Sequence, residues 1–217
     1  MRFKIPQLLA PAAQQQILIS LQAAEFVDGK LTAGWYAKQV KHNQQVKGTD
    51  GKALKEQIKT ALQQHPLFQS AVRPKHIHTL LLSRYESGMS YGTHADNAMM
   101  GPHRSDVSFT VFLNDPTDYD GGELVVEGAD DEQAYKLPAG TAFVYPSSAL
   151  HRVNKVTRGV RFVAVGWVQS LVRDPAQREV LFDLDTARRS IFAQQGKTVE
   201  FDLISKSISN LLRRWAE

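Results

Sequence analysis

Residues 84–96, RYESGMSYGTHAD, and residues 151–161, HRVNKVTRGVR, carry the signals that decide the fold of this chain. Alternate side chains of an extended segment project to the same face, so His94 and Asp96 lie close together. His151 opens the second stretch and brings a third ligand to the same point if the two strands are neighbours. Two imidazoles and one carboxylate leave coordination positions open, which suits Fe(II) and O₂ chemistry. The spacing therefore indicates a metal centre between strands.

Arg161 lies ten residues after His151, across a turn that contains Gly159. The two residues then stand on paired strands, so the guanidinium can enter the cavity that holds the metal. A buried arginine can bind a carboxylate through two parallel hydrogen bonds, which suits a dicarboxylate co-substrate such as 2-oxoglutarate. His76 and His78 form a rival pair of alternating ligands, but no carboxylate lies nearby at ligand spacing. We interpret them as structural histidines.

From about residue 76 to residue 170 the apolar residues recur at every second position, and turn signals separate the repeats. This pattern predicts eight short strands, at residues 76–85, 90–94, 105–114, 123–127, 133–137, 141–145, 150–155 and 160–170. Short strands separated by glycine and proline turns favour a double-sheet jelly roll over a parallel α/β sheet. Such a fold holds a site between its two sheets.

Both flanks of this β region have helical periodicity. Residues 11–24 and 52–64 predict amphipathic helices, the second of which ends at His65-Pro66. Residues 176–192 and 201–215 predict a helical hairpin that packs on the sheet or on a partner chain. We therefore expect a mainly β fold with flanking helices, around a double-stranded β-helix (jelly roll, cupin-like) core. The expected regions are an N-terminal helical support, the jelly-roll domain and a C-terminal helical extension, at residues 1–75, 76–170 and 171–217.

The composition excludes several classes of protein. The 217 residues include no cysteine, which excludes disulfide frameworks, zinc–thiolate modules and cysteine nucleophiles. The basic excess behind the net charge of +4 lies in residues 1–75, where lysines recur at helical spacing. We interpret them as a solvated helix face rather than a nucleic-acid surface. We recognise no signal peptide and no apolar run of membrane-spanning length, so we expect a cytoplasmic protein without membrane contact.

Several short motifs around these residues occur together in one known family. They are Arg84-Tyr85-x-x-Gly88-x-x-Tyr91-x-x-His94-x-Asp96, Phe112-Leu113-Asn114, Gly121-Gly122-Glu123-Leu124, Tyr145-Pro146 and His151-x-Val153-(x)₅-Gly159-x-Arg161. This set resembles the prolyl-4-hydroxylase-like branch of the Fe(II)/2-oxoglutarate-dependent dioxygenases. More narrowly, the core and its flanking helices are similar to the bacterial PKHD-type hydroxylases that are associated with iron uptake.

The resemblance implies a role for each residue at a matching position. The implied metal ligands are His94, Asp96 and His151, and the implied co-substrate-binding residues are Arg161, at the C5 carboxylate of 2-oxoglutarate, and Tyr85. The tyrosine that helps to hold this carboxylate in animal prolyl hydroxylases would fall within residues 109–112, where the chain has none, and Thr110 is the candidate replacement. The implied cofactors are Fe(II), the co-substrate 2-oxoglutarate, O₂, and L-ascorbate as an auxiliary reductant.

The implied activity couples oxidative decarboxylation of 2-oxoglutarate to hydroxylation of a small-molecule or peptide substrate, of amino-acid, peptide or siderophore type. One alternative is a non-catalytic module that senses iron or 2-oxoglutarate. Conversion of 2-oxoglutarate to succinate by the protein would exclude this alternative. The other is a nucleic-acid dealkylating dioxygenase, with the Arg-x-Asn-x-Thr-x-Arg signature matched only in part because Thr157 is one position late. Nucleic acid is thus the less favoured partner. The terminal helices are also candidates for a homodimer interface.

Three further segments have local interpretations. Trp35 and Tyr36 are interpreted as an aromatic packing anchor. Residues 97–104 are interpreted as a surface loop, with a lid over the site as the alternative. Gly121 and Gly122 are interpreted as a tight turn in which both glycines adopt positive φ.

Overall fold

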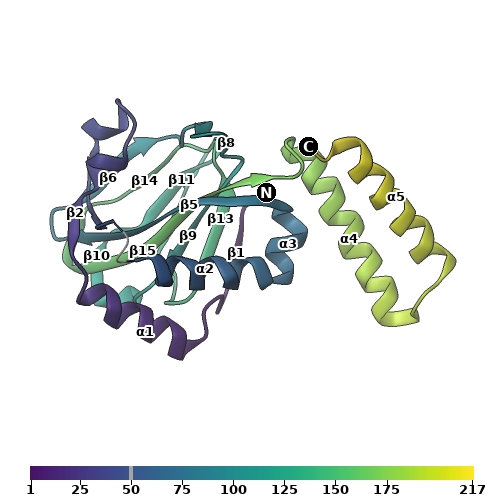
Figure 1. Ribbon diagram of the computed structural model, residues 1–217, viewed down its shortest axis with the longest axis horizontal. Helices are drawn as coiled ribbons and strands as arrows, with labels where there is room; N and C mark the ends of the chain where they lie inside the picture. The colour runs from purple at the N-terminus through teal and green to yellow at the C-terminus, as the bar shows by residue number, and fades with distance from the viewer. Residues whose placement is uncertain (49–50) are drawn as a thin grey trace.

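Two antiparallel sheets form the body of the protein in the computed structural model, which describes residues 1–48 and 51–217 (Figure 1). The main, eight-stranded sheet runs in the order β1 (Phe3–Ile5), β13 (Ala142–Pro146), β9 (Val107–Phe112), β15 (Val156–Ser170), β5 (Pro74–Glu86), β4 (Gln44–Val46) and β2 (Phe26–Asp28), and β10 (Tyr119–Gly121) also pairs with β15. The second sheet runs in the order β12 (Glu132–Tyr135), β11 (Leu124–Glu127), β14 (His151–Val153), β6 (Ser90–His94) and β3 (Lys41–His42). The expected jelly-roll fold is confirmed.

The main sheet is buried on both faces. Three helices, α1 (Pro11–Gln22), α2 (Lys52–Gln64) and α3 (Pro66–Val72), cover one face, where Ile17 and Ile58 join the core around Phe109. Side chains on the opposite face, such as Phe112, pack with Val126 of the second sheet. All six residues of β9 are buried for this reason, including the polar Ser108 and Thr110.

A proline separates the second and third helices. His65 has an extended backbone before Pro66, which a residue preceding proline prefers, so α2 ends at Gln64 as predicted. Pro66 then occupies the first turn of α3, a position that tolerates the missing N–H. The short α3 was not predicted from the sequence. It is held by Phe68, a fully buried ring that packs edge-to-face on Phe109 with 6.3 Å between centroids.

The N-terminal region contributes strands as well as helices. Strands β1 to β4 were not predicted, because each contains only two or three residues and so shows little alternation. Lys41 of β3 pairs with Tyr91 of β6 in the second sheet, whereas Gln45 of β4 pairs with Ser83 of β5 in the main sheet. The chain therefore crosses from one sheet to the other between β3 and β4 and closes one side of the space between them.

The C-terminal hairpin, α4 (Pro175–Gln195) and α5 (Val199–Trp215), lies beside the sheets and next to α3 (Figure 1). Its own small core contains Val172, Leu181 and Ile208. Arg73, at the end of α3, donates a hydrogen bond to the Leu181 carbonyl oxygen at 3.2 Å. The two predicted helices are present, but the hairpin packs mainly on α3 rather than on a sheet. None of the helices in the described residues is long and apolar enough to cross a bilayer.

Candidate metal centre and co-substrate cavity

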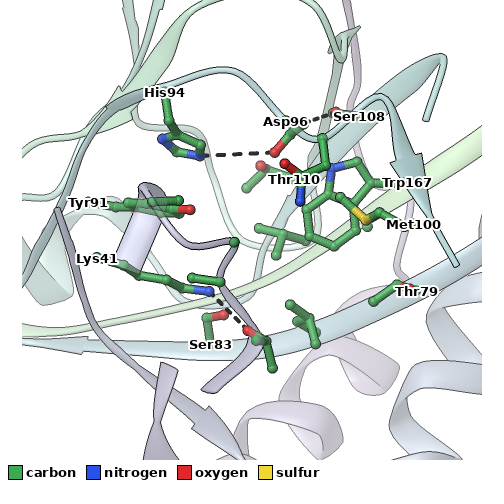
Figure 2. Close-up of a pocket in the computed structure, with 18 of the residues that line it drawn as sticks. Lys41, Thr79, Ser83, Tyr91, His94, Asp96, Met100, Ser108, Thr110 and Trp167 are labelled. Atoms are coloured by element: carbon green, nitrogen blue, oxygen red, sulfur yellow. Dashed lines mark hydrogen bonds and ion pairs between the residues drawn. The ribbon is translucent and has the colours of Figure 1, made fainter. Parts of the chain in front are cut away.

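The three predicted metal ligands meet at one end of the second sheet. His94 ends β6 and His151 begins β14, and the two residues are direct partners in the register of these neighbouring strands. Asp96 follows β6, with its carboxylate oxygens 4.0 Å from His94 Nε2 and 3.8 Å from His151 Nε2 (Figure 2). One ligand atom from each of the three side chains lies within 4.8 Å of the other two. The three side chains could therefore hold a single metal ion.

Hydrogen bonds orient both imidazoles for this purpose. His94 Nδ1 donates to the Gly92 carbonyl oxygen at 2.8 Å, and His151 Nδ1 donates to the Ala149 carbonyl oxygen at 3.0 Å. Each ring then presents the lone pair of Nε2 to Asp96. The pKa of His94 is lowered to about 4, mainly by burial and secondly by the neighbouring His151. The ring is therefore neutral near pH 7, the form that binds a metal.

Two serines position the carboxylate of Asp96, and sequence analysis did not identify them. Ser108 Oγ donates to Asp96 Oδ2 at 2.6 Å, and Ser147 Oγ lies 2.8 Å from Ser108 Oγ (Figure 2). The carbonyl oxygen of Ser147 also accepts a hydrogen bond from the backbone N–H of Asp96. A partner of this kind limits rotation of a metal-binding carboxylate. The available signal was Ser108 in the mainly apolar run Val107–Phe112, because its side chain needs a partner when buried.

Arg161 lies deeper in the same cavity, with an exposed fraction of 1%. Its guanidinium lies 5.0 Å from the ring centroid of Tyr85 and 5.6 Å from that of Phe112. Arg161 Nε and Nη1 have no hydrogen-bond partner. Leaving such donors unsatisfied is costly in a protein interior. The arrangement therefore fits a ligand that brings a carboxylate to Arg161.

The hydroxyl groups around Arg161 differ in part from the sequence expectation. Tyr85 is fully buried, and burial raises its pKa although the Arg161 charge opposes this shift. The same two effects act on Tyr119, which sequence analysis did not consider. Thr110, the expected replacement for the family tyrosine, lines the cavity but hydrogen-bonds Tyr145. Burial raises the pKa of Tyr145 well above its ordinary value, and this hydrogen bond only opposes the shift. Tyr119 is thus a second candidate for the hydroxyl that assists Arg161.

A glycine makes room for the arginine. Gly121 and Gly122 have the expected positive φ, +71° and +68°, but Gly121 ends strand β10 rather than lying in a tight turn. A Cβ atom on Gly122 would lie 3.0 Å from Arg161 Cδ and from Val156 Cγ2. Gly122 is therefore needed both for its backbone conformation and for the space occupied by the Arg161 side chain.

The cavity has a volume of about 500 Å³ and lies between the two sheets. Lys41, Met100 and Trp167 line it and surround the space below His94 and Asp96 (Figure 2). This volume is within the range of small-molecule sites. The cavity can therefore accept a further ligand next to the candidate metal centre.

The expected loop at residues 97–104 contains a small hairpin, β7 (Met99–Met100) with β8 (His103–Arg104). Met100 and Pro102 of this hairpin line the cavity. The rival histidines lie near it, where His78 Nε2 contacts the Arg104 carbonyl oxygen at 3.0 Å. Among the described residues, the only cluster of three metal-ligating side chains is the one with His94, Asp96 and His151.

The interpretation of Trp35 was wrong. Its side chain is 82% exposed and so cannot be a packing anchor. Tyr36 lines the cavity and donates a hydrogen bond to the Ala95 carbonyl oxygen at 3.2 Å. Sequence analysis could not separate these two neighbours, because consecutive residues of an irregular segment can face opposite environments.

Comparison with known proteins agrees with this architecture. Residues 80–169 match the 2OG-Fe(II) oxygenase superfamily, and residues 175–217 match the PKHD-type hydroxylase C-terminal domain. A PKHD-type hydroxylase of Picosynechococcus sp. is 66% identical over 219 residues, which is 100% of both chains. One of Gloeothece citriformis is 65% identical over 220 residues, again 100% of both chains. The chain belongs to the PKHD-type hydroxylases.

Solved structures share the fold of this PKHD-type hydroxylase at low sequence identity. A Pseudomonas putida prolyl-4-hydroxylase is 20% identical with a TM-score of 0.56, over 78% of this chain and 92% of that chain. A Trichoplax adhaerens prolyl hydroxylase, in complex with a hypoxia inducible factor peptide fragment, is 14% identical with a TM-score of 0.58, over 83% and 86%. Membership of the family identifies the protein as an oxygenase, which disfavours the non-catalytic alternative.

Proposed function

We propose that this PKHD-type hydroxylase uses Fe(II), O₂ and 2-oxoglutarate to hydroxylate an amino-acid, peptide or siderophore-related substrate. The observation that carries the proposal is the buried guanidinium of Arg161, which has free donors in the same cavity as His94, Asp96 and His151. The overall reaction balances as 2-oxoglutarate, O₂ and substrate C–H giving succinate, CO₂ and substrate C–OH. One oxygen atom enters succinate and the other enters the product.

The residues of the chain divide the work between them. His94 Nε2, His151 Nε2 and the Asp96 carboxylate would hold Fe(II), which supplies the activation of O₂ when it is bound. Arg161 binds the far carboxylate of 2-oxoglutarate through its free N–H donors, and this sets how deeply the co-substrate enters. The hydroxyl of Tyr119 lies in the same buried environment as this guanidinium. Arg161 is almost fully buried, so the carboxylate that it binds is shielded from solvent.

Ascorbate is included in the proposal as an auxiliary reductant. Its role would be to return iron to Fe(II) after turnovers in which 2-oxoglutarate is consumed without substrate hydroxylation. The support for it is the family resemblance alone. We expect succinate formation to decline within a few turnovers and to be restored by added ascorbate.

The decisive experiment is anaerobic addition of Fe(II) and then 2-oxoglutarate, monitored through the weak visible charge-transfer band of the chelated complex. We expect the band in the wild type, and a requirement for much more 2-oxoglutarate in Arg161→Ala. Arg213→Ala is the matched control, because this arginine is exposed on α5 and bonds only to Asn210. A wild-type protein that binds iron but never develops the band would overturn the proposal.

A further inference from the structure

A second cation, Lys41, lies beside the candidate metal centre. Its side chain is 5% exposed although lysine is rarely buried, and it lines the cavity. Lys41 Nζ lies 5.3 Å from the ring centroid of Tyr91, and this ring stacks on His94 with 3.7 Å between centroids and 19° between planes. The ammonium is therefore separated from a metal ligand by the thickness of one aromatic ring.

The ammonium of Lys41 is only partly satisfied. Among the described residues, Lys41 Nζ donates one hydrogen bond, to Thr32 Oγ1 at 3.1 Å. The Thr32 hydroxyl in turn donates to Gln45 Oε1 at 2.8 Å. Among the described residues, no carboxylate lies within 4.0 Å of Lys41 Nζ. An ammonium has three protons to donate, and burying it without an anionic partner is costly. Burial lowers the pKa of Lys41 to about 8, against the charges of Asp96 and Asp28, so the side chain is mostly charged at pH 7.

Lys41 and Arg161 belong to different parts of the cavity. Arg161 is on β15 and packs between the rings of Tyr85 and Phe112, whereas Lys41 is on β3 at the crossover between the sheets. In Figure 2 the Lys41 side chain enters the cavity below Tyr91 and faces the side that holds Trp167. With Arg161 occupied by 2-oxoglutarate, Lys41 is left to bind a different anion.

The surroundings of Lys41 favour an anion with an apolar body. Met100, Trp167 and Tyr36 line the same cavity as Lys41. Trp167 Nε1 is buried without a hydrogen-bond partner, so it provides a second free donor. Aromatic rings and a thioether offer contact area for a hydrocarbon or ring, whereas free N–H donors require an acceptor.

We propose that Lys41 binds a carboxylate of the primary substrate, and that the substrate of this hydroxylase is an organic acid with an apolar body. The inference rests on the proposed function, because it assigns Arg161 to 2-oxoglutarate and Lys41 to the molecule that is hydroxylated. Lys41 then determines which acid is selected and which of its carbon atoms lies next to the metal.

The test uses 4-fluorobenzoate and its neutral analogue 4-fluorobenzamide as probes, observed by fluorine NMR titration. The whole protein is first loaded with Zn(II), as a diamagnetic substitute for Fe(II), and with 2-oxoglutarate. We expect the wild type to bind the benzoate in preference to the benzamide. Lys41→Met should weaken benzoate binding on the order of tenfold or more, the effect of losing a charge-assisted hydrogen bond. Lys41→Arg should retain most of the binding, because it keeps the charge.

Lys38→Met is the matched control, since Lys38 is exposed in the same segment, and it should bind the benzoate like the wild type. Equal benzoate affinity in the wild type and Lys41→Met, or no benzoate binding by the wild type, would overturn the inference. So would a 2-oxoglutarate requirement that rises in Lys41→Met as it does in Arg161→Ala, because Lys41 would then belong to the co-substrate site. The charge-transfer band of the wild type reports on the proposed function separately.

Discussion

The cavity and the C-terminal hairpin are built in opposite ways. The polar side chains of the cavity come from strands far apart in the sequence, and each of His94, His151 and Asp96 is oriented by its own hydrogen bond. The hairpin consists of two consecutive helices around a small cluster, and leaves large apolar side chains such as Phe192 exposed. Changes in the cavity should therefore alter chemistry, whereas changes in the hairpin should alter only stability or association.

The largest expected effect is that of Asp96→Asn. The amide removes the anionic ligand while the volume of the side chain stays the same, so Fe(II) binding is weakened and succinate formation should fall about a thousandfold. Succinate formation at one fixed, limiting Fe(II) concentration and saturating 2-oxoglutarate measures this loss, and thermal unfolding of the metal-free protein checks that the variant is folded. A variant with near-wild-type turnover would show that Asp96 is not a ligand.

Leu181→Ala should lower the stability of the hairpin and leave the chemistry of the cavity unchanged. Leu181 is fully buried in the hairpin cluster, and truncation of a buried leucine costs about 2–5 kcal/mol of unfolding free energy. Because no residue of α4 or α5 lines the cavity, the charge-transfer band with 2-oxoglutarate should be unchanged at temperatures where the variant is folded. Urea denaturation and the anaerobic titration together measure both effects. A weakened band in the folded variant would reveal coupling between the two regions.

Ser108→Ala should produce a smaller chemical effect. The substitution removes the hydroxyl that donates to Asp96 Oδ2, and loss of such a supporting hydrogen bond commonly reduces metal affinity by about 10–100-fold. Competition for Fe(II) with a coloured chelator measures the affinity. Ser209→Ala provides the comparison, since this serine on α5 bonds only to the Ser205 carbonyl oxygen on the surface, and it should match the wild type.

Phe192→Ser should have the smallest effect. The ring is 56% exposed on α4 and contacts Phe201 at 5.3 Å between centroids, so the unfolding free energy should change by about 0.5 kcal/mol or less. Denaturation at two protein concentrations measures it. A larger loss that depends on protein concentration would show instead that this side chain is buried between two copies of the chain, the homodimer interface considered from the sequence.

The comparison also explains which features could be predicted from the sequence. The spacing of His94 and Asp96, and the positions of His151 and Arg161, follow from strand alternation and from one turn, which are local properties. The hairpin helices were predicted for the same reason, because their apolar residues recur within each segment. Strands β1 to β4 and helix α3 were missed, since so few residues carry no periodic signal.

Local spacing in the chain was enough to predict the jelly-roll class, the candidate ligands and the arginine, because strand alternation relates residues that are a few positions apart. The contacts of Ser108 with Asp96, of Tyr119 with Arg161 and of Lys41 with Tyr91 appear only in the folded protein. These contacts join residues 12 to 50 positions apart in the chain. Which of many buried serines, tyrosines and lysines meets the site is decided by the pairing of strands and the packing of the two sheets, and no local pattern contains that information.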